Sequence, residues 1–204
     1  MQKVTRCFYH RDADGFAAAC IVRHYFEGIQ APCDFQAVQY GEPLPLEDMQ
    51  GKNIVFVDFS PKPEEIQAIL QSCDDLKILD HHKTASYIQE LVPGSVFDVS
   101  KSGAVLAWEE FFPNQPVPEF ILYIQDRDLW QWKLPHSREV SAAVASYPME
   151  FGSNWTSWIW GVSLEELRVE GAAILRYQQQ QISRQIGNGV EMIHLAGYWA
   201  PAVL

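Results

Sequence analysis

The sequence contains few positive charges and no cysteine pairs with the spacing of a metal or redox motif. It has 15 Lys and Arg residues against 26 Asp and Glu residues, so its formal net charge is −11. Proteins that bind long nucleic acid without sequence preference neutralise phosphates with Lys and Arg, and this charge balance argues against that function. The four cysteines lack any CxxC spacing, which is typical of thiols in a reducing cytosol; they are Cys7, Cys20, Cys33 and Cys73.

Long apolar runs are also missing. The N-terminal stretch MQKVTRCFYH does not resemble a signal peptide, and no segment approaches transmembrane length. We therefore expect a soluble cytoplasmic protein with no membrane partner. The chain does contain 48% hydrophobic and 13% aromatic residues, which supply a sizeable core for 204 residues.

Strand-like and helix-like patterns alternate along the first half of the chain. The expected strands are 4–10, 33–40, 53–59, 76–80 and 95–99, and the expected helices are 14–28, 60–73 and 102–112. From residue 118 the pattern is mainly helical, at 118–126, about 137–147 and 163–186. This order predicts an α/β fold with a parallel β-sheet flanked by helices, followed by a helical cap or linker.

The expected boundaries are a core domain at 1–135, a helical cap and linker helix at 136–187, and the start of a further domain at 188–204. The aromatic segment NWTSWIWG at 154–161 lacks clear periodicity, and we expect it to pack against the cap.

Acidic and imidazole side chains follow several of the expected strands and one helix. Each alone has an ordinary interpretation as a turn, a helix cap or a surface residue. The carboxyl ends of parallel strands meet at one edge of a sheet, however, so these side chains are expected to lie together. Oxygen and imidazole ligands without thiolate suit Mn²⁺ or Mg²⁺ better than Zn²⁺. The residues are His10, Asp12, Asp14, Asp58, Asp80, His81, His82, Asp126 and Asp128.

Four motifs, in the order YHRDADG, VDFS, LDHHKTA and YIQDRDLW, resemble the signature motifs of the DHH phosphoesterase superfamily. That superfamily includes RecJ-type exonucleases, nano-RNA and cyclic-dinucleotide phosphodiesterases, family II pyrophosphatases and exopolyphosphatases. The resemblance covers residues 4 to about 133 and, more loosely, the rest of the chain. It is specific for the superfamily and does not identify the substrate.

The resemblance implies two divalent metal ions, with Mn²⁺ expected and Mg²⁺ as the alternative. One ion would be held by His10, Asp12 and Asp58. The other would be held by Asp14, Asp58, His81 and Asp126, with Asp58 bridging the two. The first-motif histidine departs from pyrophosphatase-like members, in which it stands two residues earlier.

Two further residues would take part in catalysis. Asp80 would orient a histidine, and His82 would face the substrate phosphate and assist the leaving group.

Substrate phosphate has four further candidate ligands. The stretch SKSGA opens an expected helix, so the N–H groups of Ser102 and Gly103 could bind a phosphate oxygen, although an ordinary serine cap explains Ser102 equally well. Lys83 and Arg127 stand next to expected metal ligands. They could pair with phosphate or balance the acidic residues.

Superfamily members normally continue into a smaller C-terminal domain that grips the substrate. Here VEMIHL resembles the first strand of that domain, so residues 188–204 are expected to begin a truncated copy of it. Exposed apolar residues around Trp199 would favour a homodimer.

The leading functional hypothesis is a Mn²⁺-dependent phosphoesterase acting on short oligonucleotides or nucleotides through a water activated by two metals. The alternatives are an exopolyphosphatase or pyrophosphatase, and a catalytically weak metal-binding remnant.

Overall fold

The computed structural model describes residues 3–161, 163–187, 189–195 and 197–202. The chain divides into two compact units. The first comprises Met1–Ser137 and Pro148–Ser163, and the second comprises Arg138–Tyr147 and Leu164–Leu204. Among the described residues, no helix combines the length and the apolar content needed to cross a bilayer.

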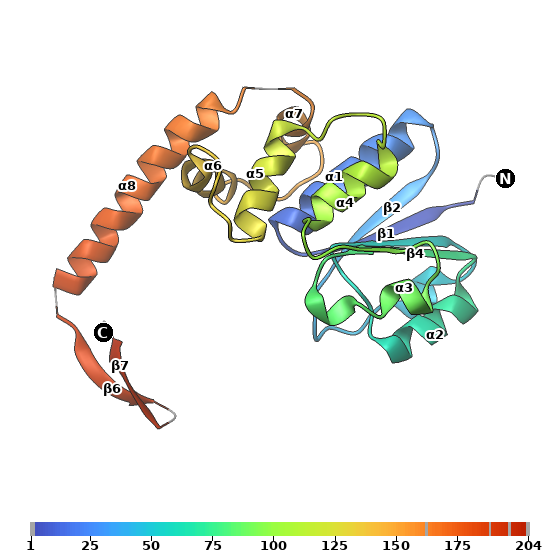
Figure 1. Ribbon diagram of the computed structural model, residues 1–204, viewed down its shortest axis with the longest axis horizontal. Coiled ribbons are helices and arrows are strands. Elements are labelled where there is room, and N and C mark those ends of the chain that lie inside the picture. The colour runs from blue at the N-terminus through green and yellow to red at the C-terminus, as the bar shows by residue number, and fades with distance from the viewer. Residues whose placement is uncertain (1–2, 162, 188, 196, 203–204) are drawn as a thin grey trace. The chain divides into compact units, whose positions relative to one another are not determined.

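The first unit is built on a five-stranded sheet in which every strand pair is parallel (Figure 1). The strand order is β2-β1-β3-β4-β5. The strands are β1 (Thr5–His10), β2 (Cys33–Val38), β3 (Asn53–Val57), β4 (Asp75–Asp80) and β5 (Val96–Phe97). The α/β fold predicted from the sequence is confirmed, although the last strand has two residues rather than the expected five.

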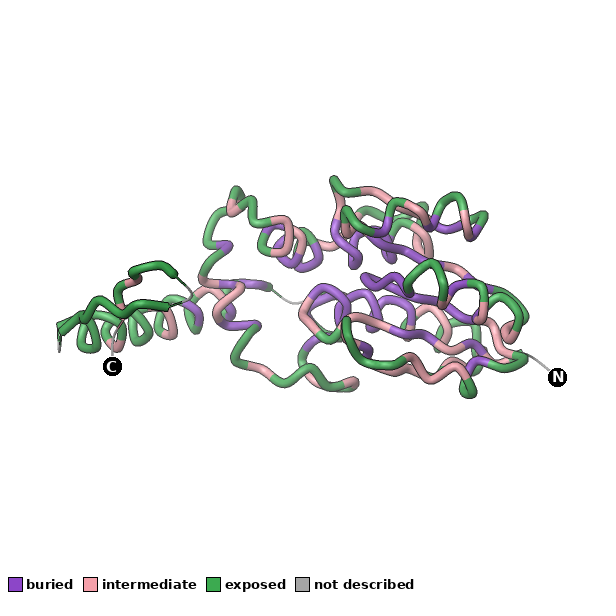
Figure 2. The backbone as a smooth tube through the Cα atoms, turned by 90° about the horizontal axis from the view of Figure 1, so that it is seen from below, coloured by how far each residue is buried: buried purple, intermediate pink, exposed green. Residues whose placement is uncertain are grey.

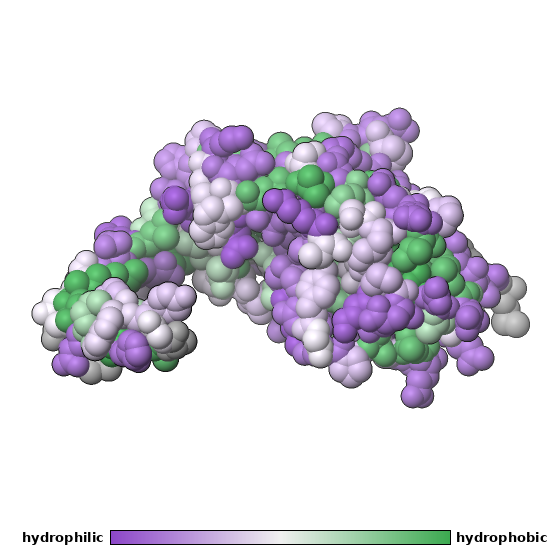
Figure 3. Space-filling model, turned by 60° about the horizontal axis from the view of Figure 1, so that its bottom comes forward, coloured by the Kyte–Doolittle hydropathy of each residue, from purple (hydrophilic) through white to green (hydrophobic). Residues whose placement is uncertain are grey.

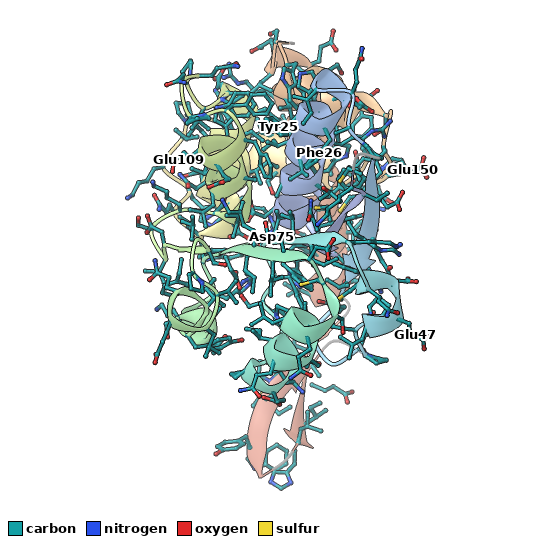
Figure 4. The ribbon with its side chains drawn as sticks, turned by 90° about the vertical axis from the view of Figure 1, so that its right-hand side faces the viewer. Tyr25, Phe26, Glu47, Asp75, Glu109 and Glu150 are labelled. Atoms are coloured by element: carbon teal, nitrogen blue, oxygen red, sulfur yellow. The ribbon has the colours of Figure 1, made fainter. Side chains whose placement is uncertain are left out.

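Helices cover both faces of this sheet, as Figure 4 shows with the sheet nearly edge-on. One face carries α1 (Ala13–Gly28) and α4 (Gly103–Phe111), and α5 (Glu119–Asp128) packs against both of these helices. The other face carries α2 (Pro63–Ser72) and α3 (Ile88–Leu91) with the short 3₁₀ helices η1 (Leu46–Met49) and η2 (Lys83–Ala85). Coverage of both faces explains why the central strand β3 is almost continuously apolar.

Burial is concentrated in the sheet and the helices that flank it (Figure 2). Between the sheet and α2, the fully buried rings of Phe8 and Phe56 stack with centroids 5.0 Å apart. Ile66 and Ile69 of α2 fill the same layer because they lie on one face of that helix. The core therefore holds the strand ends at fixed positions.

The aromatic segment at 154–161 differs from the expectation that it packs against the cap. It forms α7 (Asn154–Ile159) within the first unit, where it contacts α1 and α5. The ring of Trp155 lies 5.1 Å from that of Phe16 and 5.8 Å from that of Phe120. The buried residues of this short helix are Trp155, Trp158 and Ile159, and six residues are too few to show a helical period.

The second unit contains α8 (Glu165–Gly187) and α6 (Ser137–Val144), except for the first residue of α6, Ser137, which belongs to the first unit. Its hairpin is formed by β6 (Glu191–Leu195), which covers the strand expected at VEMIHL, and β7 (Tyr198–Ala202). The helix α8 and the hairpin are largely exposed (Figure 2). On the face drawn in Figure 3, hydrophilic side chains separate several smaller hydrophobic areas.

Candidate metal centre

Strand register brings the expected site residues to one edge of the sheet. Tyr9, Val57 and Leu79 are aligned on neighbouring strands. The next residues along, His10, Asp58 and Asp80, therefore emerge side by side. The strand order reverses between β1 and β3, and ligands of open parallel sheets bind beyond the carboxyl ends of the strands at such a reversal.

Two glycines allow helices to approach this edge closely. A Cβ atom at Gly15, in the first turn of α1, would lie 2.3 Å from the carbonyl oxygen of His10. A Cβ atom at Gly103, the first residue of α4, would meet Asp58 at a distance of 2.4 Å. Only glycine fits at such separations.

Asp58 lies at the centre of the cluster. Its side chain is 1% exposed, and its backbone adopts a left-handed conformation with φ of 56°. Such a conformation is unfavourable for a residue with a side chain and is concentrated at functional sites. Its Oδ1 atom lies 3.1 Å from Nε2 of His81, and its Oδ2 atom lies 3.5 Å from Nδ1 of His10. Asp58 thus faces two groups of residues at once.

The first group consists of His10, Asp12 and Asp58, whose potential ligand atoms lie within 4.8 Å of one another. The Nδ1 atom of His10 is 2.8 Å from Oδ2 of Asp12, but without hydrogen-bond geometry. Both His10 Nδ1 and Asp58 Oδ2 are buried and have no hydrogen-bond partner among the described residues. Buried polar atoms without hydrogen-bond partners are rare, and a cation bound between these two atoms would satisfy both.

Gln39, which follows β2, fixes the ring of His10. Its Oε1 atom accepts a hydrogen bond from the backbone N–H of Tyr40 and lies 2.6 Å from Nε2 of His10. Because this oxygen can only accept, Nε2 carries the proton. The other ring nitrogen, Nδ1, therefore points at Asp12 and Asp58, as a metal-binding histidine with an outer hydrogen-bond partner does.

The second group consists of Asp14, His81 and Asp128. The Nε2 atom of His81 lies 3.4 Å from Oδ2 of Asp128 and 3.8 Å from Oδ2 of Asp14. Asp14 is buried, and its oxygens accept hydrogen bonds from the backbone N–H groups of Gly103 and Ala104. The helix N-terminus thus holds this carboxylate toward His81.

Asp126 does not join the second group, contrary to the assignment made from the sequence. Its carboxylate accepts hydrogen bonds from the backbone N–H groups of Lys133 and Leu134, at 2.9 and 3.2 Å. These bonds, with a contact to Ser137, lower its pKa although burial opposes the shift. Asp126 therefore organises the loop after α5, and Asp128 lies where Asp126 was expected.

Asp80 orients His82. The fully buried Asp80 carboxylate accepts hydrogen bonds from Nδ1 of His82 at 2.7 Å, from Oγ of Ser60 at 2.5 Å, and from the backbone N–H groups of His81 and His82. The hydrogen bond to Asp80 raises the pKa of His82 against the effect of burial. Because Asp80 holds the Nδ1 proton, Nε2 is the ring atom that remains to exchange a proton.

The electrostatics of the cluster show a shortage of positive charge. Burial, with repulsion from Asp58 and Asp128, raises the pKa of Asp14 well above its ordinary value. Burial and Asp58 also raise the pKa of Asp128 to about 6. At His10, burial would lower the pKa, but the carboxylates of Asp12 and Asp58 outweigh it and raise the pKa to about 10. These groups retain protons that a bound cation would displace.

Of the four candidate phosphate ligands, two have backbone N–H groups that are already bound within the protein, and two are exposed side chains. The N–H of Gly103 is occupied by Asp14, and the N–H of Ser102 donates to Oε1 of Gln125. Ser102 itself caps α4, so the helix start holds a carboxylate of the chain rather than presenting free donors to phosphate. Lys83 and Arg127 are exposed, and no ion pair involving either is recorded within the described ranges.

Sequence analysis missed two supporting residues. Gln39 could have been found because it follows a strand at the same edge of the sheet as the metal-binding candidates. Ser60 lies within the VDFS motif, but its role depends on contact with Asp80, 20 residues away.

Comparison with known proteins yields relatives of uncharacterised function. No protein-family model matches the chain. It is 33% identical over 192 residues to an uncharacterized protein of Acanthamoeba polyphaga mimivirus, covering 85% of this chain and 44% of the viral protein. The chain therefore spans less than half of the length of that relative.

Among solved structures, the fold is similar to that of an uncharacterized protein from Helicobacter pylori. The TM-score is 0.59 at 14% identity, over 88% of this chain and 63% of the other. Superposition on Thermus thermophilus RecJ in complex with Mn²⁺ gives a TM-score of 0.42 at 15% identity, over 91% of this chain and 36% of RecJ. That second score is too low to relate the two proteins. The similarity to the Helicobacter pylori protein is one of fold alone.

Proposed function

We propose that this chain is a divalent-metal-dependent phosphoesterase that hydrolyses short oligonucleotides or nucleotides. The observation that carries the proposal is the shared position of Asp58, whose two oxygens face two separate groups of acidic and imidazole side chains. No Lys or Arg ion pair to these carboxylates is recorded in the described part of the chain. The resemblance of the four motifs to the DHH superfamily supports the same conclusion.

The ligand set fits two ions, with Mn²⁺ as the expected metal and Mg²⁺ as the alternative. His10, Asp12 and Asp58 would hold one, and Asp14, Asp58, His81 and Asp128 would hold the other. Two such ions would lower the pKa of a water at the site and would stabilise charge on the attacking and leaving oxygens. In this proposal Asp128 replaces Asp126, the ligand that the resemblance to the DHH superfamily implied.

The chain's own residues would handle the leaving group. His82 is one-third exposed, and Asp80 fixes its ring through Nδ1. Its Nε2 atom can therefore deliver a proton to a leaving oxygen while Asp80 stabilises the charged ring. Asp80 acts as a positioning residue because it touches His82 rather than the substrate.

The test combines metal titration with a substrate panel. The purified chain should bind two Mn²⁺ and cleave a dinucleotide such as pApA, and Asp58→Asn should abolish both properties. Phosphate release from pyrophosphate or polyphosphate, without dinucleotide cleavage, would establish the polyphosphatase alternative. Metal binding without turnover of any substrate would overturn the proposed activity and favour a metal-binding remnant.

A further inference from the structure

A pocket lies beside the candidate metal centre, and two of its lining residues, Tyr40 and Ser60, contact residues of that centre. It is lined by residues 40–44, 59 and 60, with Lys62 and Glu65, and has a volume of about 260 Å³. We call it the Tyr40 pocket. Pockets for drug-sized ligands are roughly 300–1,000 Å³, so this one suits a smaller, ring-sized group.

Tyr40 connects the pocket to the candidate catalytic residues. Its ring stacks on that of Phe59 with centroids 4.5 Å apart, and it lies 5.4 Å from the ring of His10 and 5.7 Å from that of His82. Its hydroxyl oxygen accepts a hydrogen bond from the N–H of Ser60, whose Oγ holds Asp80. A group bound here would therefore adjoin a phosphate located at His82.

The ring of Tyr40 is available for stacking. Tyr40 is 47% exposed, whereas the Phe59 side chain beneath it is only 4% exposed. One side of the Tyr40 ring is covered by protein, and the residue still presents a large accessible surface. Nucleic-acid bases stack on aromatic side chains that are held in this way, with little dependence on base identity.

The pocket combines apolar surface with charges of both signs. It is lined by Leu44 together with Glu42, Lys62 and Glu65. The carboxylate of Glu42 is already paired with Arg11, and the carboxylate of Glu65 accepts a hydrogen bond from the backbone N–H of Lys62. A flat, uncharged ring needs no counter-charge, and it can use both the apolar surface and the polar rim.

We propose that the Tyr40 pocket receives the base of a nucleotide whose phosphate lies at the metal centre. This inference rests on the proposed function and adds to it a binding site for the base of the substrate. Tyr40 would be a specificity-determining residue, since its ring contacts a part of the substrate that inorganic phosphates lack.

The test compares AMP with inorganic phosphate by calorimetry in the presence of Mn²⁺. Tyr40→Ala should weaken AMP binding about 10-fold or more, the effect of removing a stacking ring, and should leave phosphate and Mn²⁺ affinity unchanged. Tyr40→Phe should restore AMP binding. Tyr177→Ala, an exposed tyrosine of α8, is the matched control and should bind AMP as the wild type does.

Equal weakening of AMP and phosphate binding would overturn the inference and make Tyr40 a support for His10 and His82. Unchanged AMP binding in Tyr40→Ala would also overturn it. The two proposals fail separately. If Tyr40→Ala hydrolyses pApA with unchanged kinetics, base binding by the Tyr40 pocket is refuted and the phosphoesterase activity stands. If AMP binding depends on Tyr40 but no substrate is hydrolysed, the phosphoesterase activity is refuted and base binding by the pocket stands.

Discussion

The first residue of α4, Gly103, lies so close to Asp58 that a Cβ atom there would be 2.4 Å from the Cβ of Asp58. The same glycine donates its N–H to Asp14 at 2.6 Å. One backbone position with no side chain thus binds one acidic residue of the candidate metal centre and packs closely against another. The shape of the site depends on α4 as well as on the strands.

Gly103→Ala should therefore damage metal binding although it replaces no ligand. We expect Mn²⁺ affinity to fall about 10- to 100-fold, as for other residues that position ligands, and stability to fall by about 1–3 kcal/mol because the helix must move. Calorimetric titration and thermal unfolding measure the two effects. Gly28→Ala is the control, since a Cβ there meets nothing within 4 Å. Native affinity in Gly103→Ala would show that the close approach is unimportant.

Asp58→Asn should remove both ions, because the two oxygens of this carboxylate face different groups. The matched control is Asp75→Asn, which changes an exposed residue at the opposite end of a neighbouring strand (Figure 4). Electron paramagnetic resonance of bound Mn²⁺ gives the stoichiometry. A variant that keeps one site at full strength would contradict the bridging position.

Asp126 and Asp128 should have separable effects. Asp128→Asn should weaken one of the two Mn²⁺ sites and leave the fold intact. Asp126→Ala should keep both sites but lose about 1 kcal/mol of stability, because the part-buried hydrogen bonds from the N–H groups of Lys133 and Leu134 would be lost. Metal stoichiometry and urea unfolding of both variants decide the matter. The reverse pattern would restore the assignment suggested by the sequence.

His82→Ala should retain both ions and lose turnover by ~10²–10⁴-fold, the usual contribution of a general acid. Asp80→Asn should also lower turnover, because the His82 ring would lose its charged partner. Steady-state kinetics with parallel metal titration separate these effects. If His82→Ala instead loses an ion, His82 is a ligand.

Metal affinity should rise with pH. Because the pKa of Asp128 is raised to about 6, this carboxyl is protonated below that pH and ionised above it. A cation needs the ionised form, so Mn²⁺ binding should tighten as pH increases through about 6 and should release protons. Titrations in buffers of different ionisation enthalpy count those protons. Affinity that is constant between pH 5 and pH 7 would argue against Asp128 as a ligand.

The strand ends could be predicted because apolar runs are followed directly by Asp58 and Asp80, and parallel topology brings such ends together. The choice between Asp126 and Asp128 could not be made in the same way. The sequence analysis ended the helix at residue 126, whereas α5 continues to Asp128. Residues two apart on a helix point about 200° away from each other, so only one of the two can face the cluster.

The hydrogen-bond partners of the α4 N-terminus could not be predicted from the sequence either. The serine and glycine of SKSGA correctly indicated a helix start, but its N–H groups bind Asp14, which lies 89 residues earlier in the chain. Local patterns identify donors, whereas distant packing decides which acceptor they meet.

That distant bond has a consequence for the order in which the protein is made. Asp14 leaves the ribosome long before Gly103 and Asp128. When it emerges, the backbone N–H groups that bind its carboxylate in the folded protein have not yet been synthesised. A contact between residues so far apart in the sequence also requires the closure of a long loop, which has an entropic cost. A nascent chain that ends before Gly103 therefore lacks the donors that hold Asp14, and an ion bound at that stage would be held only by the residues that have already emerged.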